Sequence, residues 1–156
     1  MDRFLIRITM GYPKPEEERA MLRNLGDEIP FDTVRAVTSA AELVDAQRQI
    51  AAVYVSDAVS DYIVALAEGT RRHPQLVMGA SPRATRALYR AAKVWAAMEG
   101  RDFVTPDDVQ TLAHPVLEHR LVLESGARFS GVTAGAILKE ILERTEASPE
   151  AAAHEG

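Results

Sequence analysis

Apolar residues recur every three or four positions in several stretches of the chain, which is the spacing of one face of an α-helix. Each stretch also has a start signal, a serine, threonine or proline placed just before the apolar positions begin. The pattern predicts helices over residues 15–26, 39–52, 56–72, 81–100, 105–115 and 133–145. Because most of the apolar pattern is helical, we expect helices to pack against helices.

The helix expected at residues 81–100 is the longest. Ser81 is expected to cap it, Pro82 to open its first turn and Gly100 to end it. Three helices have a clear apolar face that is expected to enter the core. These faces are Val59, Tyr62, Ile63 and Leu66; Leu88, Ala91, Trp95 and Met98; and Ile137, Leu138, Ile141 and Leu142.

A few short segments have the composition of β-strands. Residues 4–8, FLIRI, read as a strand, but one strand needs a sheet that the rest of the sequence does not supply. Residues 53–56 are also β-like, and the end of the segment 115–123 is expected to pair with them. The predicted fold is therefore mainly α, with a minor β-hairpin and a single leftover strand in front. Residues 146–156 are polar and predicted to form a disordered tail.

Composition narrows the class of protein. With 156 residues the chain can form one domain with appendages, and its lack of cysteine excludes disulfides and thiolate metal sites. The apolar run near the N-terminus is interrupted by Arg3 and Arg7, and no segment has the roughly 20 apolar residues of a membrane span. We therefore expect a cytoplasmic protein that does not enter the membrane.

The charge of the chain is unevenly distributed. The net charge is −5, yet residues 71–101 contain seven basic residues and one acidic residue. Arg83, Arg86, Arg90 and Lys93 follow one another at spacings that place them on one face of the longest helix, opposite its apolar face. Arg83 lies in the first turn, where free backbone amides and a guanidinium together suit a phosphate group. The alternative is an ordinary solvated helix face.

Other kinds of function have less support in the residues. His73, His114, His119 and His154 do not have the spacing of a metal site. The basic face could bind a nucleic acid, but the sequence pI of about 5.4 and the acidic remainder of the chain disfavour this. A third alternative is a stand-alone interaction module, in which residues 4–8 add a strand to the sheet of a partner.

Two separated segments resemble the MoxR family of AAA+ ATPases. DRFLIRITMGYPKPEEERAML, from Asp2 onward, resembles the junction where the last strand of the nucleotide-binding core passes into the helical lid. GASPRATRALYRAAKVWAAMEGRDFVTPDDVQTLAHPVLEHRLVL, residues 79–123, is similar to the second half of that lid. The resemblance implies that residues 1–12 end the core, that residues 13–145 form the lid, and that residues 146–156 lie beyond it.

The resemblance also implies roles for individual residues. Arg3 matches the arginine finger, a catalytic residue that acts in trans on the nucleotide of a neighbouring subunit. Arg83 matches the sensor-2 arginine, which contacts the γ-phosphate, and Ser81 and Arg86 are assigned to the same nucleotide site. ATP and Mg²⁺ are the implied ligands of the complete ATPase.

The segments that bind ATP most directly have no counterpart in the sequence. No G-x-x-x-x-G-K-[ST] phosphate loop and no apolar strand ending in Asp-Glu occurs, and both would precede Met1. We therefore expect this chain alone neither to hydrolyse ATP nor to bind ATP and Mg²⁺ tightly. The implied partners are the missing core, neighbouring subunits of a hexameric ring and proteins with von Willebrand A domains, and the implied activity is chaperone-like remodelling or maturation of partner proteins.

Overall fold

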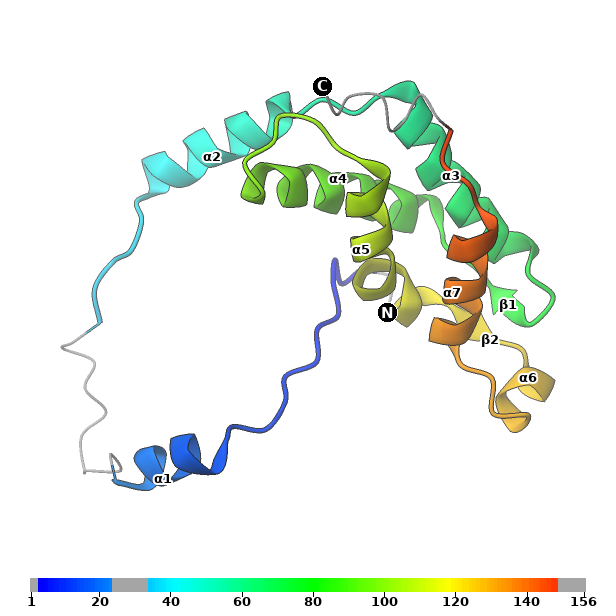
Figure 1. Cartoon of the computed structure of the whole chain (residues 1–156), viewed down its shortest axis with the longest axis horizontal. Helices are drawn as coiled ribbons and strands as arrows, with labels where there is room; N and C mark the ends of the chain where they lie inside the picture. Colours follow the sequence, from blue (N-terminus) through cyan, green and yellow to red (C-terminus); the bar gives the residue numbers. More distant parts are fainter. Residues whose placement is uncertain (1–2, 24–33, 149–156) are drawn as a thin grey trace.

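The computed structural model describes residues 3–23 and 34–148. Its helices are α1 (Pro15–Arg23), α2 (Ala40–Ala52), α3 (Asp57–Arg72), α4 (Pro82–Met98), α5 (Pro106–Leu117), the 3-10 helix η2 (Glu118–Arg120), α6 (Ser125–Phe129) and α7 (Ala134–Arg144). Two short strands, β1 (Leu76–Met78) and β2 (Val122–Leu123), form a small sheet (Figure 1). The fold is mainly helical, as predicted. None of the described helices is long and apolar enough to cross a membrane.

The helix starts predicted from capping residues are confirmed. The side chains of Ser56, Ser81 and Thr133 each accept a hydrogen bond from the backbone N–H of the third residue in the following helix. Ser39 and Glu42 form a complete capping box at α2, in which each side chain bonds the backbone of the other residue. Local hydrogen bonding therefore sets where most of these helices begin. The predicted end of α1 at Gly26 lies outside the described residues.

The core is built around α4, which packs against α2, α3 and α5, and α7 closes the side formed by α3 and α5. Val59, Ile63 and Leu66 of α3 and Leu138 of α7 are almost completely buried, as the helical pattern predicted. Met98 was expected in the core, but 73% of it is exposed. It ends α4 just before the chain turns at Glu99, so no other helix covers that side chain.

Helix α5 is longer than predicted. Pro115 was expected to end it, but the helix continues to Leu117 and passes directly into η2. Pro115 has no N–H, so one hydrogen bond between successive turns of the helix is missing at this position. Val116 and Leu117 are completely buried, and this apolar burial favours the extra turn. The short helix α6 had no predicted counterpart.

The strand pairing differs from the prediction. The strand β2 does not pair with residues 53–55 but lies antiparallel to β1, with Leu76 opposite Leu123. The two strands come from segments before α4 and after η2, so they form a small sheet without a local turn. Tyr54 instead bonds Asp102 and Val104 through its backbone N–H and C=O, at 2.7 Å and 3.0 Å, which joins the α2–α3 connection to the α4–α5 loop.

The beginning of the chain is built differently from the rest. We call residues 3–23 and 34–52 the N-terminal arm, and residues 53–145 the helical body. In the N-terminal arm no residue is buried, and residues 4–8 run without a paired strand among the described residues. Figure 1 shows the first segment leaving the helical body and leading to α1, which lies well apart from it. The predicted disordered tail lies almost entirely outside the described residues.

Candidate functional site: a hollow lined by arginines

The start of α4 is held against the end of α3 by specific contacts. The hydroxyl of Thr70 accepts the backbone N–H of Ala80 at 2.8 Å, and Nε of Arg71 donates to the carbonyl of Ala80 at 2.7 Å. A Cβ atom on Gly79 would lie 2.6 Å from the backbone nitrogen of Arg71, so only glycine allows this close approach. These contacts fix the first turn of α4, and with it the backbone of Arg83.

A hollow of about 810 Å³ opens beside this first turn. Five arginine side chains line it, together with Leu5, Pro82 and Ala87. The arginines are Arg3, Arg83, Arg86, Arg90 and Arg120. We call this site the arginine hollow. It combines three residues of the predicted basic face with two residues that are remote from that face in the sequence.

Among the residues that the structure describes, no acidic residue lines the arginine hollow. Arg83, Arg86 and Arg90 are exposed, and within the described part of the chain none of them forms an ion pair. Pro82 also lines the hollow, so the positive end of the α4 dipole adjoins it. Several guanidinium groups brought together without carboxylates favour an anion. Arg83 is therefore open to a ligand and is not sealed in an internal ion pair.

Arg3 reaches the arginine hollow because the residues after it are attached to the end of α5. The backbone N–H of Arg7 donates to the carbonyl of Pro115 at 2.9 Å, and Nε2 of His119 lies 3.2 Å from the carbonyl of Phe4. The structure thus brings Arg3 and Arg83, separated by most of the predicted lid, into the lining of one hollow.

The other residues of the predicted site are placed differently. Ser81 caps α4 and does not line the arginine hollow. Lys93 lies on the same helix as the arginines, but its Nζ donates to the carbonyl of Ala51 at 2.8 Å and lies 5.9 Å from the centre of the Tyr89 ring. Lys93 therefore joins α4 to α2, whereas Arg86 lines the hollow.

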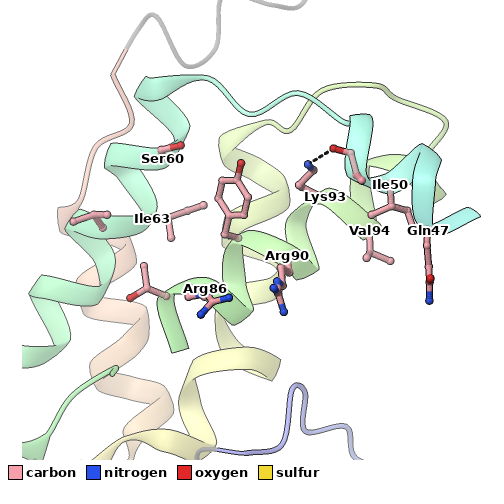
Figure 2. A pocket seen from close by; sticks show the side chains of 12 residues that line it. Gln47, Ile50, Ser60, Ile63, Arg86, Arg90, Lys93 and Val94 are labelled. Atoms are coloured by element: carbon pink, nitrogen blue, oxygen red, sulfur yellow. Dashed lines mark hydrogen bonds between the residues drawn. The ribbon is translucent and has the colours of Figure 1, made fainter. Parts of the chain in front are cut away.

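An apolar groove of about 1010 Å³ adjoins the hollow between α2, α3 and α4. Arg86 and Arg90 belong to the lining of both, so the two spaces are continuous along α4. Figure 2 shows these two guanidinium groups turned to the same side of α4, with Ile50 and Ile63 on the flanking helices. The dashed line in Figure 2 marks the hydrogen bond from Lys93 to α2.

A buried ion pair stabilises the turn that follows α4. Both terminal nitrogens of Arg101 donate to the carboxylate of Asp108, of which only 4% is exposed. Burial alone would raise the pKa of Asp108, but hydrogen bonds from Arg101 and from the backbone and hydroxyl of Thr105 outweigh it, and the pKa is lowered. Asp108 is thus a structural carboxylate that stays ionised.

Arg120 was not identified from the sequence. It is part of the lining of the arginine hollow, and only 7% of it is exposed. The only signal for it was a basic residue directly before the apolar run of residues 121–123. For metal ions, the described residues contain no group of three His, Cys, Asp or Glu side chains that could hold one.

The comparisons with known proteins first identify the class of domain to which the helical body belongs. Residues 68–141 match the AAA lid domain family, and this range contains α4, α5 and most of the helical body. The chain also superposes on the crystal structure of a proposed ATPase from Cytophaga hutchinsonii with a TM-score of 0.81. The two are 28% identical, over 93% of this chain and 47% of that one. The helical body is therefore an AAA lid domain.

Relatives with curated names define the family. The chain is 36% identical to the chaperone MoxR1 of Mycobacterium tuberculosis over 91% of its own length, and 33% identical to the protein MoxR of Methylorubrum extorquens over 79%. It is 39% identical to the protein YeaC of Bacillus subtilis over 91% of its length. The chain therefore corresponds to a portion of the MoxR-type AAA+ ATPases. It spans between 40% and 44% of the length of these three relatives.

Proposed function

We propose that this chain is the lid portion of a MoxR-type ATPase and that the arginine hollow receives the terminal phosphates of ATP. In this proposal Arg83 is the sensor-2 arginine and Arg3 the arginine finger. The observation that carries it is the set of five arginines around one hollow, to which the described parts of the chain, 3–23 and 34–148, add no acidic side chain. Guanidinium groups bind phosphate oxygens in pairs and stabilise the charge that develops during phosphoryl transfer.

The residues present fit the phosphates of the nucleotide but not its metal ion. Arg83 and Arg86 offer forked donors, and the start of α4 adds the positive end of a helix dipole. Mg²⁺ prefers carboxylate and water oxygens, and none of the described carboxylates lines the hollow. The magnesium ligands would therefore come from the nucleotide-binding core, whose motifs the sequence lacks. Ser81 would contribute by capping and orienting α4.

The shared hollow bears on which nucleotide Arg83 contacts. Arg3 and Arg83 of one chain line the same space, so both would address the same phosphate group. If Arg3 acts in trans, as the family resemblance implies, Arg83 then acts on the nucleotide of the neighbouring subunit as well. A ring of subunits would in this way sense through the lid of one subunit whether the next has ATP bound.

The N-terminal arm supports the assignment of residues 1–12 to the end of the core. Phe4, Ile8, Met10 and Tyr12 are all more than half exposed, which is unfavourable unless another surface covers them. We propose that the core of the complete cytoplasmic protein covers this arm and pairs with residues 4–8. We also propose that the complete protein forms a hexameric ring and acts on partner proteins, with von Willebrand A-domain proteins among them. The name chaperone of the mycobacterial relative agrees with an action on partner proteins.

A binding experiment tests the proposal. The chain is titrated with inorganic tripolyphosphate and with ATP in a calorimeter, together with the variants R83A and R128A. Arg83 lines the hollow, whereas Arg128 is an exposed arginine outside it, so the two substitutions remove the same charge. We expect R83A to weaken tripolyphosphate binding by about 10- to 100-fold, the value of one or two charge-assisted hydrogen bonds. The R128A variant should bind within about 2-fold of the original chain.

The same samples distinguish the alternatives. Equal losses in R83A and R128A would indicate diffuse attraction of anions to the basic surface and would contradict the phosphate site. Phosphate release from ATP that depends on Arg3 and Arg83 in this chain alone would contradict the expectation that the core is needed for hydrolysis. Tight, salt-dependent binding of a DNA oligonucleotide would favour the nucleic-acid alternative.

The interaction-module alternative rests on the exposed apolar arm. In that case the chain would bind a partner through residues 4–12 without any role for ATP. If the chain is part of an ATPase as proposed, a separately produced nucleotide-binding core binds it, and the substitution I8K abolishes that binding. If the core does not bind the original chain at all, the interaction module becomes the better account.

A further inference from the structure

Arg120 is a buried arginine whose hydrogen bonds join the helical body to the N-terminal arm. One terminal nitrogen donates to the carbonyl of Val116, one turn earlier, at 2.8 Å. The other donates to the carbonyl of Phe4 and lies 3.5 Å from that of Leu5. The planar guanidinium thus spans the space between the end of α5 and the residues immediately after Arg3.

Other contacts at the same place support the same attachment. His119 lies 3.2 Å from the carbonyl of Phe4 through Nε2, and the N–H of Arg7 donates to the carbonyl of Pro115. The carbonyls of Pro115 and Val116 are available because α5 ends here, and the last carbonyls of a helix have no partner within it. Apolar packing contributes little, since 67% of Phe4 and 53% of Leu5 are exposed. Polar contacts therefore decide where this segment lies.

We infer that Arg120, with His119 beside it, is a positioning residue that holds Arg3 at the arginine hollow. The inference rests on the proposed function, because the proposed function supplies the phosphate group that Arg3 contacts. Arg3 directly precedes Phe4, so a fixed carbonyl at Phe4 limits where the guanidinium of Arg3 can reach. Arg120 belongs to the lid and Arg3 to the segment assigned to the end of the core, so this contact couples the two, and the position of the lid affects whether Arg3 and Arg83 meet one phosphate group.

Arginine suits this role better than lysine. Its rigid planar group presents several N–H donors in different directions and can bond Val116 and Phe4 together. A lysine keeps the charge but has a single nitrogen at the end of a flexible chain. The substitution R120K therefore separates the geometry of the side chain from its charge. The exposed Arg128 provides the matched control, R128K.

Hydrogen exchange of the full chain tests the positioning contact without any ligand. In R120K we expect the backbone N–H of Arg7 to exchange at least about 10-fold faster, while the amides of α3 and α4 keep their rates. R128K should leave all of these rates unchanged. Unchanged exchange at Arg7 in R120K, or faster exchange throughout the helical body, overturns the inference. If R120K does not fold, H119A gives the same test, since it removes another contact to Phe4.

A double-mutant cycle then tests the effect on Arg3 with inorganic tripolyphosphate as the probe. In the original chain we expect R3A to weaken binding by about 10-fold, and in the R120K background by less than about 2-fold. Equal losses in both backgrounds overturn the inference. If the original chain does not bind tripolyphosphate, the proposed function fails, whereas the exchange at Arg7 still decides whether Arg120 holds the segment.

Discussion

The N-terminal arm and the helical body both contain helices with well-formed ends, but only the helical body buries side chains. In the arm, α2 has a complete capping box at Ser39, yet none of its residues is buried. In the body, α4 has a similar cap at Ser81 and buries six residues along one face. Capping and apolar spacing are therefore enough to place a helix in the chain, but not to determine what it packs against.

The exposed apolar residues of the N-terminal arm indicate where the nucleotide-binding core of the complete protein would pack. Leu43 and Val44 of α2, and Met21 and Leu22 of α1, are apolar residues whose exposed fractions lie between 44% and 69%. In the helical body the comparable positions of α3 and α7 fill the core. The arm thus has the apolar spacing of a region that packs against other elements, but its apolar side chains are exposed. This is expected if a nucleotide-binding core covers the arm. The arginine hollow lies where the two regions meet.

The largest effect should come from the core of the helical body. Leu66 is completely buried, so L66A should lower the free energy of unfolding by about 2–5 kcal/mol through lost apolar burial and a cavity. Leu22 of α1 is 69% exposed, and L22A should change the free energy of unfolding by less than about 0.5 kcal/mol. Urea denaturation followed by circular dichroism measures both. A comparable loss in L22A would show that the arm contributes to the stability of this chain.

A backbone contact provides a second comparison between the two regions. A Cβ atom at Gly79 would clash with the backbone of α3 near Arg71, and neither backbone can move aside easily. We expect G79A to cost about 1–3 kcal/mol of unfolding free energy. A Cβ atom at Gly11, in the arm, would meet nothing within 4 Å, so G11A serves as the control with no measurable loss. Thermal unfolding of the two variants side by side decides whether the α3–α4 junction is as closely packed as described.

Two ion pairs provide the third and smallest comparison. Asp108 is buried and paired with Arg101, whereas Asp45 of α2 pairs with Arg48 at the surface, where 63% and 76% of the two side chains are exposed. We expect D108N to lower the unfolding free energy by about 1–2 kcal/mol at neutral pH and D45N by less than about 0.5 kcal/mol. The unfolding free energy is measured in urea at neutral pH for both variants and the original chain.

The pH dependence sharpens this third comparison. Because the pKa of Asp108 is lowered in the folded chain, its contribution to stability is complete above the ordinary value of 3.8. That contribution is lost as the pH falls below 3.8 through the lowered pKa. The difference in stability between the original chain and D108N should therefore shrink in urea titrations at progressively more acidic pH. A difference that stays constant down to the lowest pH at which the chain folds would mean that the charge of Asp108 is not what stabilises the turn.

The sequence by itself determined the helical class, most helix starts, much of the core and the resemblance to the MoxR family. It could do so because caps depend on residues three positions apart and helical faces on residues three or four apart, so both can be read locally. The basic face of α4 followed from the same spacing. The error at Met98 came from applying that spacing to the last turn, where no neighbouring helix is present.

Only the tertiary structure decided which distant segments meet. The pairing of β1 with β2 and the presence of Arg3, Arg83 and Arg120 in one hollow join residues that local patterns do not connect. The continuation of α5 beyond Pro115 likewise depends on burial against the rest of the helical body. The physical reason is that such contacts depend on how helices pack and on which carbonyls remain free at a helix end. The sequence placed Arg83 on one face of α4, and the fold placed a second group of arginines opposite it.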